Sequence, residues 1–314
     1  MRDAAVCGVL VVDKPAGPTS FDVVSRVRRL LRAERAGHTG TLDPAATGVL
    51  AVCVGEAVKL QQFLAGGDKE YEATVVFGSA TATGDAEGEV VARADASGLR
   101  PESVREALPR FLGLIEQVPP MFSAVRVGGR RLHEAARAGE EVERQPRQVA
   151  VHALELLDFV STPDRGVALA RLTIRCGKGT YVRALAVDLG SALGVPAHLG
   201  ALRRTAAGPF RIEEALTLPE AERLASADRA GLCARLVGMA DALRDAPAIR
   251  LSPGEVRDVG HGRALARGEA AGLVRALDGD GRLVAVCEAG GGALRPVRVM
   301  SWGRCGPRPR QPNH

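Results

Sequence analysis

The stretch "GHTGTLDPAATGVL", residues 37–50, holds a single acidic residue, Asp43, among small residues and backbone breakers. Four of its residues are glycine or proline, and four others carry a hydroxyl or imidazole group. One interpretation is ordinary turn chemistry, because Asp bonds its own backbone and the following Pro fixes φ. The other interpretation is a rigid frame that holds Asp43 for a chemical task. The rest of the sequence decides between them.

Strand and helix patterns alternate irregularly on both sides of this stretch. They predict strands over 8–14, 69–78 and 167–177, and helices over 19–32 and 180–194. The first helix is expected to be capped and amphipathic, with apolar positions at Phe21, Val24, Val27 and Leu31. Because there is no regular βαβ order, the pattern favours an α+β fold built on a mixed, largely antiparallel sheet.

The length of 314 residues suggests about two domains. A boundary is expected near 244–249, because short β-like runs after residue 248 are typical of a small all-β module. The prediction is a large domain over 1–247, a small β-rich domain over 248–303, and a disordered tail over 304–314.

A long basic segment interrupts the large domain at 119–147. It begins with a double proline and carries six arginines and four glutamates. One interpretation is a solvated excursion, and the other is a mobile loop that grips a partner.

The positive charge is concentrated toward the C-terminus. Residues 248–314 hold 11 Arg against 6 acidic residues, which leaves the rest of the chain balanced and places the net charge of +5 there. Such an asymmetry favours an acidic partner such as nucleic acid. The preference for Arg over Lys carries no such information, since a GC-rich genome also produces it.

Several kinds of chemistry are excluded by missing motifs. The segment "CGKGT" (176–180) is not a phosphate-binding P-loop, and neither a GxSxG nor an HExxH motif occurs. The six cysteines form no CxxC pair, so neither a zinc site nor a disulfide framework is predicted, and we expect reduced thiols. With these motifs missing, we expect no metal and no cofactor. No apolar run approaches a membrane span and no export signal is present, so we expect a soluble cytoplasmic protein. Carboxylate chemistry, as at sugar carbons, remains.

The stretch 37–50 resembles the catalytic motif of pseudouridine synthases, and further segments resemble the bacterial TruB family of tRNA pseudouridine-55 synthases. These segments are "DKPAGPTSFDVV" (13–24), "KEYEATVVFGSATATGDAEGEV" (69–90), "QVPPMFSAVRVGGRRLHEAARAGEEVER" (117–144), "CGKGTYVRALAVDLG" (176–190) and "HLGALRRTAAGPF" (198–210). The resemblance covers most of residues 8–245, so the catalytic interpretation of Asp43 replaces the turn interpretation.

The resemblance implies a pseudouridine synthase domain with a thumb-like RNA-binding insertion at 119–147, followed by a PUA-like RNA-binding domain. It implies that a uridine in the T loop of tRNA, at position 55, is flipped out and isomerised to pseudouridine. The implied partner is the T arm of tRNA, without a small-molecule cofactor, metal or membrane, and the implied state is a monomer.

Three residues match the catalytic positions of the family. Asp43 matches the nucleophile, and Arg183 matches an arginine that can keep this acid ionised, since a nearby cation lowers a carboxylate pKa. Tyr71 matches the tyrosine that stacks on the target base and is a candidate for the proton transfers. Either a glycal or direct addition of the carboxylate is compatible with these residues.

Other matches concern binding and support. His38 matches the residue that fills the space of the flipped nucleotide, while Tyr181 and Leu202 match the uridine pocket; Leu202 could equally be core. Lys14 and Pro15 match a motif that braces the site. Phe122 departs from the tyrosine common in the family, which affects the polar contacts of the thumb.

A tRNA-binding or tRNA-folding protein, whose catalytic activity is secondary, is the alternative function. The joint presence of Asp43, Tyr71 and Arg183 favours the enzyme, because a pure RNA-binding protein does not need these three residues together.

Overall fold

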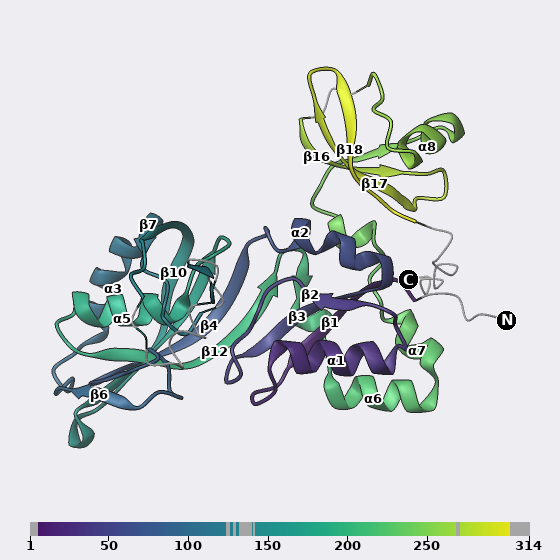
Figure 1. Ribbon diagram of the computed structural model, residues 1–314. Helices are drawn as coiled ribbons and strands as arrows, with labels where there is room; N and C mark the ends of the chain where they lie inside the picture. The colour runs from purple at the N-terminus through teal and green to yellow at the C-terminus, as the bar shows by residue number, and fades with distance from the viewer. Residues whose placement is uncertain are drawn as a thin grey trace. The chain divides into compact units, whose positions relative to one another are not determined.

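The computed structural model describes residues 6–123, 126–127, 130–131, 140, 142–267 and 271–301 (Figure 1). The chain divides into two compact units. The first comprises Met1–Pro44, Gly48–Gly67 and Ala207–His314, and the second comprises Ala45–Thr47 and Asp68–Ala206. Both units combine helices with largely antiparallel strands, so the predicted α+β class is confirmed.

The first unit is built on the strand order β14-β1-β3. β1 (Gly8–Lys14) pairs antiparallel with β3 (Thr47–Val54), which also pairs with the short β2 (Ala36–His38). The parallel partner of β1 is β14 (Leu216–Thr217), which makes the sheet mixed, as predicted.

Both faces of β1 and β3 are buried, as expected for strands that are apolar at nearly every position. Alternate side chains, including Leu10 and Val12, pack against α1 (Ser20–Leu30), α6 (Leu218–Ala227) and α7 (Arg229–Ala234). Their neighbours Val9 and Val11 pack on the other side, against η1 (Gly55–Leu60), α2 (Gln61–Leu64) and η5 (Asp241–Leu243).

The helix α1 begins where the sequence predicts and ends earlier. Thr19 caps it by accepting from the Asp22 amide, while the Asp22 carboxylate accepts in return from the Thr19 amide. Val24, Val27 and Leu31 are buried as expected, with Leu31 as the C-cap. The prediction was wrong for Phe21, which is 73% exposed. Val23 takes its place, because the buried face is centred between positions 23, 24 and 27.

The C-terminal part of the first unit forms a four-stranded sheet in the order β15-β16-β17-β18. Its strands are β15 (Ala248–Arg250), β16 (Gly272–Leu277), β17 (Leu283–Gly290) and β18 (Ala293–Val299). We call residues 248–301 the C-terminal module. The expectation of an all-β module was wrong, because α8 (Pro253–Gly260) belongs to it. The segment "SPGE" (252–255) forms a capping box with Pro at the first turn, a helix start that two glycines obscure in the sequence.

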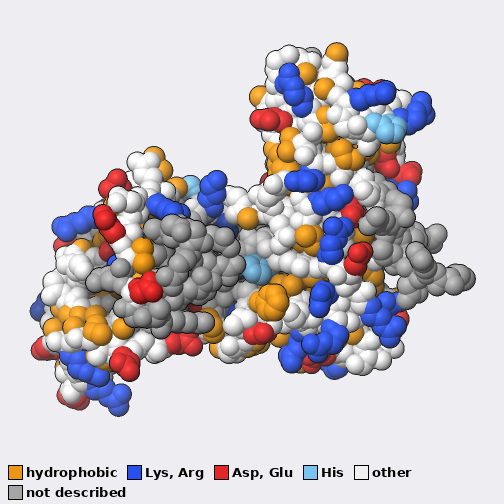
Figure 2. Space-filling view, in the orientation of Figure 1, with side chains coloured by type: hydrophobic (Ala, Val, Ile, Leu, Met, Phe, Trp, Pro, Cys, Tyr) orange, Lys and Arg blue, Asp and Glu red, His pale blue; other side chains and the backbone are white. Residues whose placement is uncertain are grey.

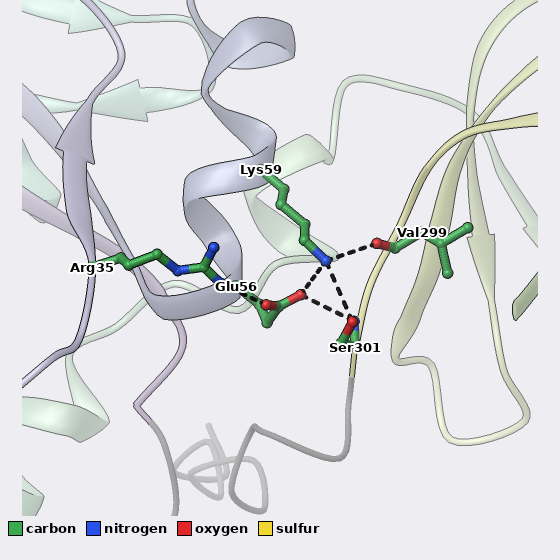
Figure 3. A network of polar contacts seen from close by, with 5 residues as sticks. All are labelled: Arg35, Glu56, Lys59, Val299 and Ser301. Atoms are coloured by element: carbon green, nitrogen blue, oxygen red, sulfur yellow. Dashed lines mark hydrogen bonds and ion pairs between the residues drawn. The ribbon is translucent and has the colours of Figure 1, made fainter.

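The C-terminal module is joined to the rest of the first unit by a polar network (Figure 3). The buried Glu56 carboxylate accepts from Arg35 at 2.8 Å and from the Ser301 amide at 3.0 Å, and it pairs with Lys59 at 2.6 Å. Lys59 in turn donates to the Val299 carbonyl at 3.1 Å. The apolar cluster beside β1 and β3 also includes module residues: Leu277, Leu283, Val286 and Met300.

The second unit has the strand order β12-β4-β11-β10-β7. These strands are β12 (Ala197–Ala207), β4 (Lys69–Phe77), β11 (Val167–Cys176), β10 (Arg147–Thr162) and β7 (Gly113–Gln117). The pairs β4–β11, β10–β11 and β7–β10 are antiparallel. The unit also contains β5 (Ser79–Thr81), β6 (Val90–Arg93), α3 (Pro101–Ala107), η2 (Leu108–Phe111), η3 (Pro163–Arg165) and α5 (Val182–Ala192).

The remaining short elements are β8 (Arg126–Val127) and β9 (Arg130–Arg131), which pair within the predicted insertion, and β13 (Phe210–Arg211) and η4 (Ile212–Glu214) of the first unit. Much of the insertion at 119–147 and the predicted tail at 304–314 lie outside the described residues.

Four cysteines carry free thiols, as expected: Cys53, Cys176, Cys233 and Cys287. Cys7 takes part in a disulfide, so the expectation of reduced thiols was wrong at that position. Its isolated place in the sequence gave no sign of a partner. Among the described residues, none of the helices combines the length and the apolar character needed to cross a membrane.

Candidate active site

Asp43 lies in the loop between β2 and β3, and the loop is held on both sides of it. The Leu42 amide donates to Ser20 Oγ at 2.9 Å, and this hydroxyl donates to the Leu42 carbonyl at 2.9 Å. On the other side, the Pro44 carbonyl accepts from the Gly17 amide, also at 2.9 Å. Backbone groups on either side of Asp43 are therefore bonded to the segment that leads into α1.

Lys14 adds a fourth hydrogen bond to the same loop. The residue is fully buried at the end of β1, and its Nζ donates to the carbonyls of Pro15 and Pro44, each at 2.9 Å. Burying an ammonium group is costly unless it is hydrogen-bonded, and here the two carbonyls supply the acceptors. Lys14 thus bonds the loop directly beside Asp43, and the Pro15 carbonyl helps to hold the Lys14 ammonium in place.

His38 is the last residue of β2, just before the Asp43 loop. Its carbonyl accepts from Gln61 Nε2 at 2.8 Å. The same Gln61 side chain lies so close to Gly37 that a Cβ there would clash with it. This contact explains one glycine of the quoted stretch and fixes the end of β2 from which His38 projects.

In the second unit, Arg183 is nearly buried in the first turn of α5. Its Nη1 donates to the Thr83 carbonyl at 3.1 Å and lies 3.5 Å from Asp85 Oδ2. Its Nη2 donates to the Phe122 carbonyl at 2.7 Å. The guanidinium plane is therefore fixed from two directions, by the turn after β5 and by the start of the basic insertion.

Asp85 is a residue that the sequence analysis missed. Its Oδ1 accepts from Thr83 Oγ1 at 2.5 Å and from the Glu87 amide at 3.1 Å, which leaves Oδ2 toward Arg183. The turn needs Gly84, whose φ of +72° is unfavourable for residues with a Cβ. The quoted segment 69–90 contains this "TGD" sequence, but nothing in the sequence joins it to a residue about a hundred positions later.

Tyr181 is the N-cap residue of α5 and makes no side-chain cap bond. Instead, the side chain of Gln117 bonds both of its backbone groups. The Tyr181 amide donates to Gln117 Oε1 at 3.0 Å, and Gln117 Nε2 donates to the Tyr181 carbonyl at 3.3 Å. Gln117 ends β7 and is only 2% exposed, so it is a second residue that the sequence analysis missed.

Tyr71 lies in the middle of β4, opposite Ile174 of β11, and is 9% exposed. Lys69 lies on the same face two residues earlier and is equally buried. Burial lowers the pKa of Lys69, and the charge of Arg204 lowers it further. Leu202 is half-buried on β12, and its carbonyl accepts from Thr47 Oγ1 at 3.5 Å.

The candidate residues thus form two sets. Lys14, Pro15, His38 and Asp43 belong to the first unit, and Tyr71, Tyr181, Arg183 and Leu202 belong to the second. Within each set, elements far apart in the sequence converge through buried hydrogen bonds. A carboxylate in a fixed loop and an arginine with a fixed guanidinium are the groups expected for covalent chemistry by an ionised acid.

Comparison with protein families gives matches along nearly the whole chain. The model described as TruB family pseudouridylate synthase (N terminal domain) matches residues 28–182. The tRNA pseudouridylate synthase B C-terminal domain matches 183–243, and the tRNA pseudouridine synthase II C-terminal model matches 247–301.

Among curated proteins, the tRNA pseudouridine synthase B of Symbiobacterium thermophilum is 53% identical, over 83% of this chain and 84% of the relative. The enzyme of the same name from Aromatoleum aromaticum is 48% identical, over 94% of this chain and 93% of the relative.

Among solved structures, a chain of an H/ACA ribonucleoprotein bound to a substrate RNA containing 2′-deoxyuridine has a TM-score of 0.71. It is 26% identical, over 94% of this chain and 86% of that chain. A chain of a Cbf5–Nop10–Gar1 complex has the same score at 27% identity, over 95% and 86%. Because curated relatives match this chain at 48–53% identity over most of their length, the chain belongs to the TruB family of tRNA pseudouridine synthases.

Proposed function

We propose that this enzyme isomerises the uridine at position 55, in the T loop of tRNA, and that Asp43 is its nucleophile. Isomerisation of uridine to pseudouridine in tRNA is the reaction of its family. The observation that carries the choice of Asp43 is the hydrogen bonding of both of its neighbours, Leu42 and Pro44, to the segment between Lys14 and Ser20.

The reaction replaces one bond to the sugar by another. The bond between N1 of uracil and C1′ breaks, a bond between C5 and C1′ forms, and a proton leaves C5 while N1 gains one. The overall change is neither an oxidation nor a reduction, so side chains alone can carry it. A carboxylate is suited to this chemistry because it stabilises or attacks positive charge at the sugar carbon.

The other candidate residues receive roles from this chemistry. Arg183 favours the ionised form of Asp43, and Asp85 positions Arg183 through the contact at 3.5 Å. Tyr71 stacks on the uracil and takes part in proton transfer. Tyr181 and Leu202 bind the uridine, and His38 fills the space that the flipped nucleotide leaves.

The proposal extends to organisation and partners. Residues 1–247 form the catalytic domain with the thumb-like insertion 119–147, and residues 248–303 form a PUA-like RNA-binding domain. The family models that end at 243 and begin at 247 support a division there. The T arm is the part of tRNA that is recognised, and the enzyme is a cytoplasmic monomer.

The test is single-turnover conversion of an unmodified T-arm hairpin, with pseudouridine mapped at single-nucleotide resolution. Because Asn keeps the shape of Asp without a nucleophilic oxygen anion, Asp43→Asn should abolish product and leave RNA affinity within about twofold. Glu87→Gln, which changes an exposed carboxylate, is the control. Substantial product from Asp43→Asn would contradict the assignment of the nucleophile. Binding by the wild type without any product would favour the tRNA-binding or tRNA-folding alternative.

A further inference from the structure

The exposed surface of α1 carries positive charge that the acidic residues of the neighbouring helices do not neutralise. Figure 2 shows Lys and Arg side chains gathered over the region of α1 and α6. Arg28 and Arg29 are exposed on α1, and Arg32 is exposed just after it. None of the three forms an ion pair with a described residue, whereas their neighbour Arg26 pairs with Glu222 at 3.3 Å.

Phe21 lies on the same surface. It is 73% exposed, the most exposed of the large hydrophobic residues in the described part of the chain, in a protein with only seven Phe, two Tyr and one Trp. A single exposed apolar residue needs no explanation by itself. The position of Phe21 relative to the arginines, however, calls for one.

Phe21 and Arg28 are seven positions apart, which is almost two complete turns of an α-helix. Their side chains therefore leave the helix on one line, about 10 Å apart along its axis, while Arg29 leaves it about 100° further round, on the adjoining exposed side. We call Phe21, Arg28 and Arg29 the α1 stripe. The acidic residue nearest to it on the helix, Asp22, is occupied as part of the cap, where it accepts from Thr19.

The α1 stripe begins next to the Asp43 loop. Ser20, the residue before Phe21, makes both hydrogen bonds to Leu42, the residue before Asp43. The stripe then follows α1 away from this attachment. When the reacting nucleotide of an RNA lies at Asp43, the nucleotides next to it lie close enough to reach the stripe.

We propose that the α1 stripe is an RNA-binding surface, on which Phe21 stacks against an unpaired base of the substrate while Arg28 and Arg29 bind phosphates. This inference rests on the proposed function, since it uses the position of the reacting nucleotide. An aromatic platform followed by unpaired arginines is the combination that single-stranded nucleic acid requires, because bases offer a stacking face and the backbone offers regular negative charge. An acidic protein partner would use the arginines but would have no need of a stacking face.

The test is equilibrium binding of unmodified tRNA and of the T-arm hairpin over a range of salt concentrations. All proteins carry Asp43→Asn, so that the RNA is not consumed. Arg28→Ser with Arg29→Ser should weaken binding and lower the slope of log affinity against log salt by about 1.5, because each lost phosphate contact removes roughly 0.7–0.9. Phe21→Ala should weaken binding about fivefold or more without changing the slope, and Phe21→Tyr should restore it.

Matched controls separate the stripe from general effects. Arg105→Ser with Arg110→Ser removes the same charge from exposed positions of the second unit, and Val91→Ala shortens another exposed apolar side chain. An equal loss in the stripe variants and their controls would overturn the proposal, and so would a loss confined to either Phe21 or the arginine pair. Conversion of the hairpin by the wild type is measured separately, so a failure of the proposed function is seen independently of these affinities.

Discussion

At the scale of single residues, the proposed chemistry depends on a guanidinium whose direction is fixed by partners. Arg183 bonds two backbone carbonyls, those of Thr83 and Phe122, and its Nη1 lies 3.5 Å from the Asp85 carboxylate. The contact at 3.5 Å is a charge interaction in a nearly buried place, where it is screened less by water than at a surface. Asp85 therefore contributes to both the orientation and the charge balance of the arginine.

We expect Asp85→Asn to slow the chemical step while leaving RNA affinity within about twofold. The amide keeps the shape of the turn but removes the negative charge from Arg183, and a charge-assisted contact of this kind contributes about 1.5–3 kcal/mol, or roughly 10–100-fold in rate. Single-turnover conversion at saturating hairpin is the measurement. Glu87→Gln, in the same turn, should behave as the wild type. An Asp85→Asn enzyme with the wild-type rate would show that the backbone carbonyls alone fix Arg183.

The candidate residues that sequence reasoning found are those that carry distinctive chemistry within a recognisable motif, such as Asp43 and Arg183. The residues that it missed, Asp85 and Gln117, act on side chains or backbone groups far away in the sequence. Their partners are fixed by the sheet and by glycine turns, which single-sequence patterns do not reveal. Phe21 was misplaced because the helical period is matched by Phe21 and Val24, at i and i+3, as well as by Val23 and Val27, at i and i+4.

At the scale of elements, β7 and the start of α5 are joined by one side chain. Gln117 holds the N-cap residue of α5 in place, because it bonds both the amide and the carbonyl of Tyr181. Five residues later, the Phe122 carbonyl bonds Arg183. The strand β7 and the residues that follow it therefore hold the start of α5. Two candidate site residues, Tyr181 and Arg183, lie there.

Gln117→Ala should leave the Tyr181 backbone groups without these bonds and reduce the single-turnover rate more than the affinity. Gln117→Glu keeps the acceptor for the Tyr181 amide but loses the donor to its carbonyl, so its rate should lie between those of the wild type and Gln117→Ala. The free energy of unfolding, measured alongside by thermal unfolding, should fall by about 1–3 kcal/mol for Gln117→Ala. Gln148→Ala, at an exposed glutamine of β10 that lies beyond the insertion, is the control. Equal rates for all three variants would contradict a positioning role of Gln117.

The strands β1, β4 and β11 and the helices α1 and α5 followed from the sequence, because the apolar pattern of each is bounded by clear turn residues. The helix α8 did not, since its two glycines weaken the helical pattern and its stability depends on the capping box and on packing against the module. Tertiary contacts of this kind override local propensity.

At the scale of the whole first unit, the C-terminal module is part of a shared core. Leu277, Leu283, Val286 and Met300 belong to one cluster with residues of β1 and β3, such as Val9 and Val49. A chain that ends at residue 247 would expose this cluster to water. The proposed contribution of the module to RNA binding is therefore best measured in the full-length protein, with the packing intact.

We expect the network around Glu56 to make the joining of this module dependent on pH. Although burial raises the pKa of Glu56, the bonds from Lys59 and the Ser301 amide and the charge of Arg35 outweigh burial and leave the pKa below its ordinary value. A carboxyl whose pKa is lowered by folding stabilises the folded state above its unfolded pKa, about 4.3 for Glu. That stabilisation is lost as the pH falls below this value and through the lowered pKa of the folded protein.

We therefore expect Glu56→Gln to lower the free energy of unfolding by about 1–2 kcal/mol near pH 7, because Arg35 and Lys59 then lose their charged acceptor. The difference from the wild type should shrink as the pH falls below about 4, where the wild-type carboxyl also becomes protonated. Thermal unfolding of both proteins between pH 3 and pH 7 is the measurement. Glu102→Gln, which removes an exposed carboxylate paired with Arg105, should change stability little at any pH. A Glu56→Gln penalty that is the same at both ends of this range would mean that the shared apolar cluster, and not the charge network, holds the module in place.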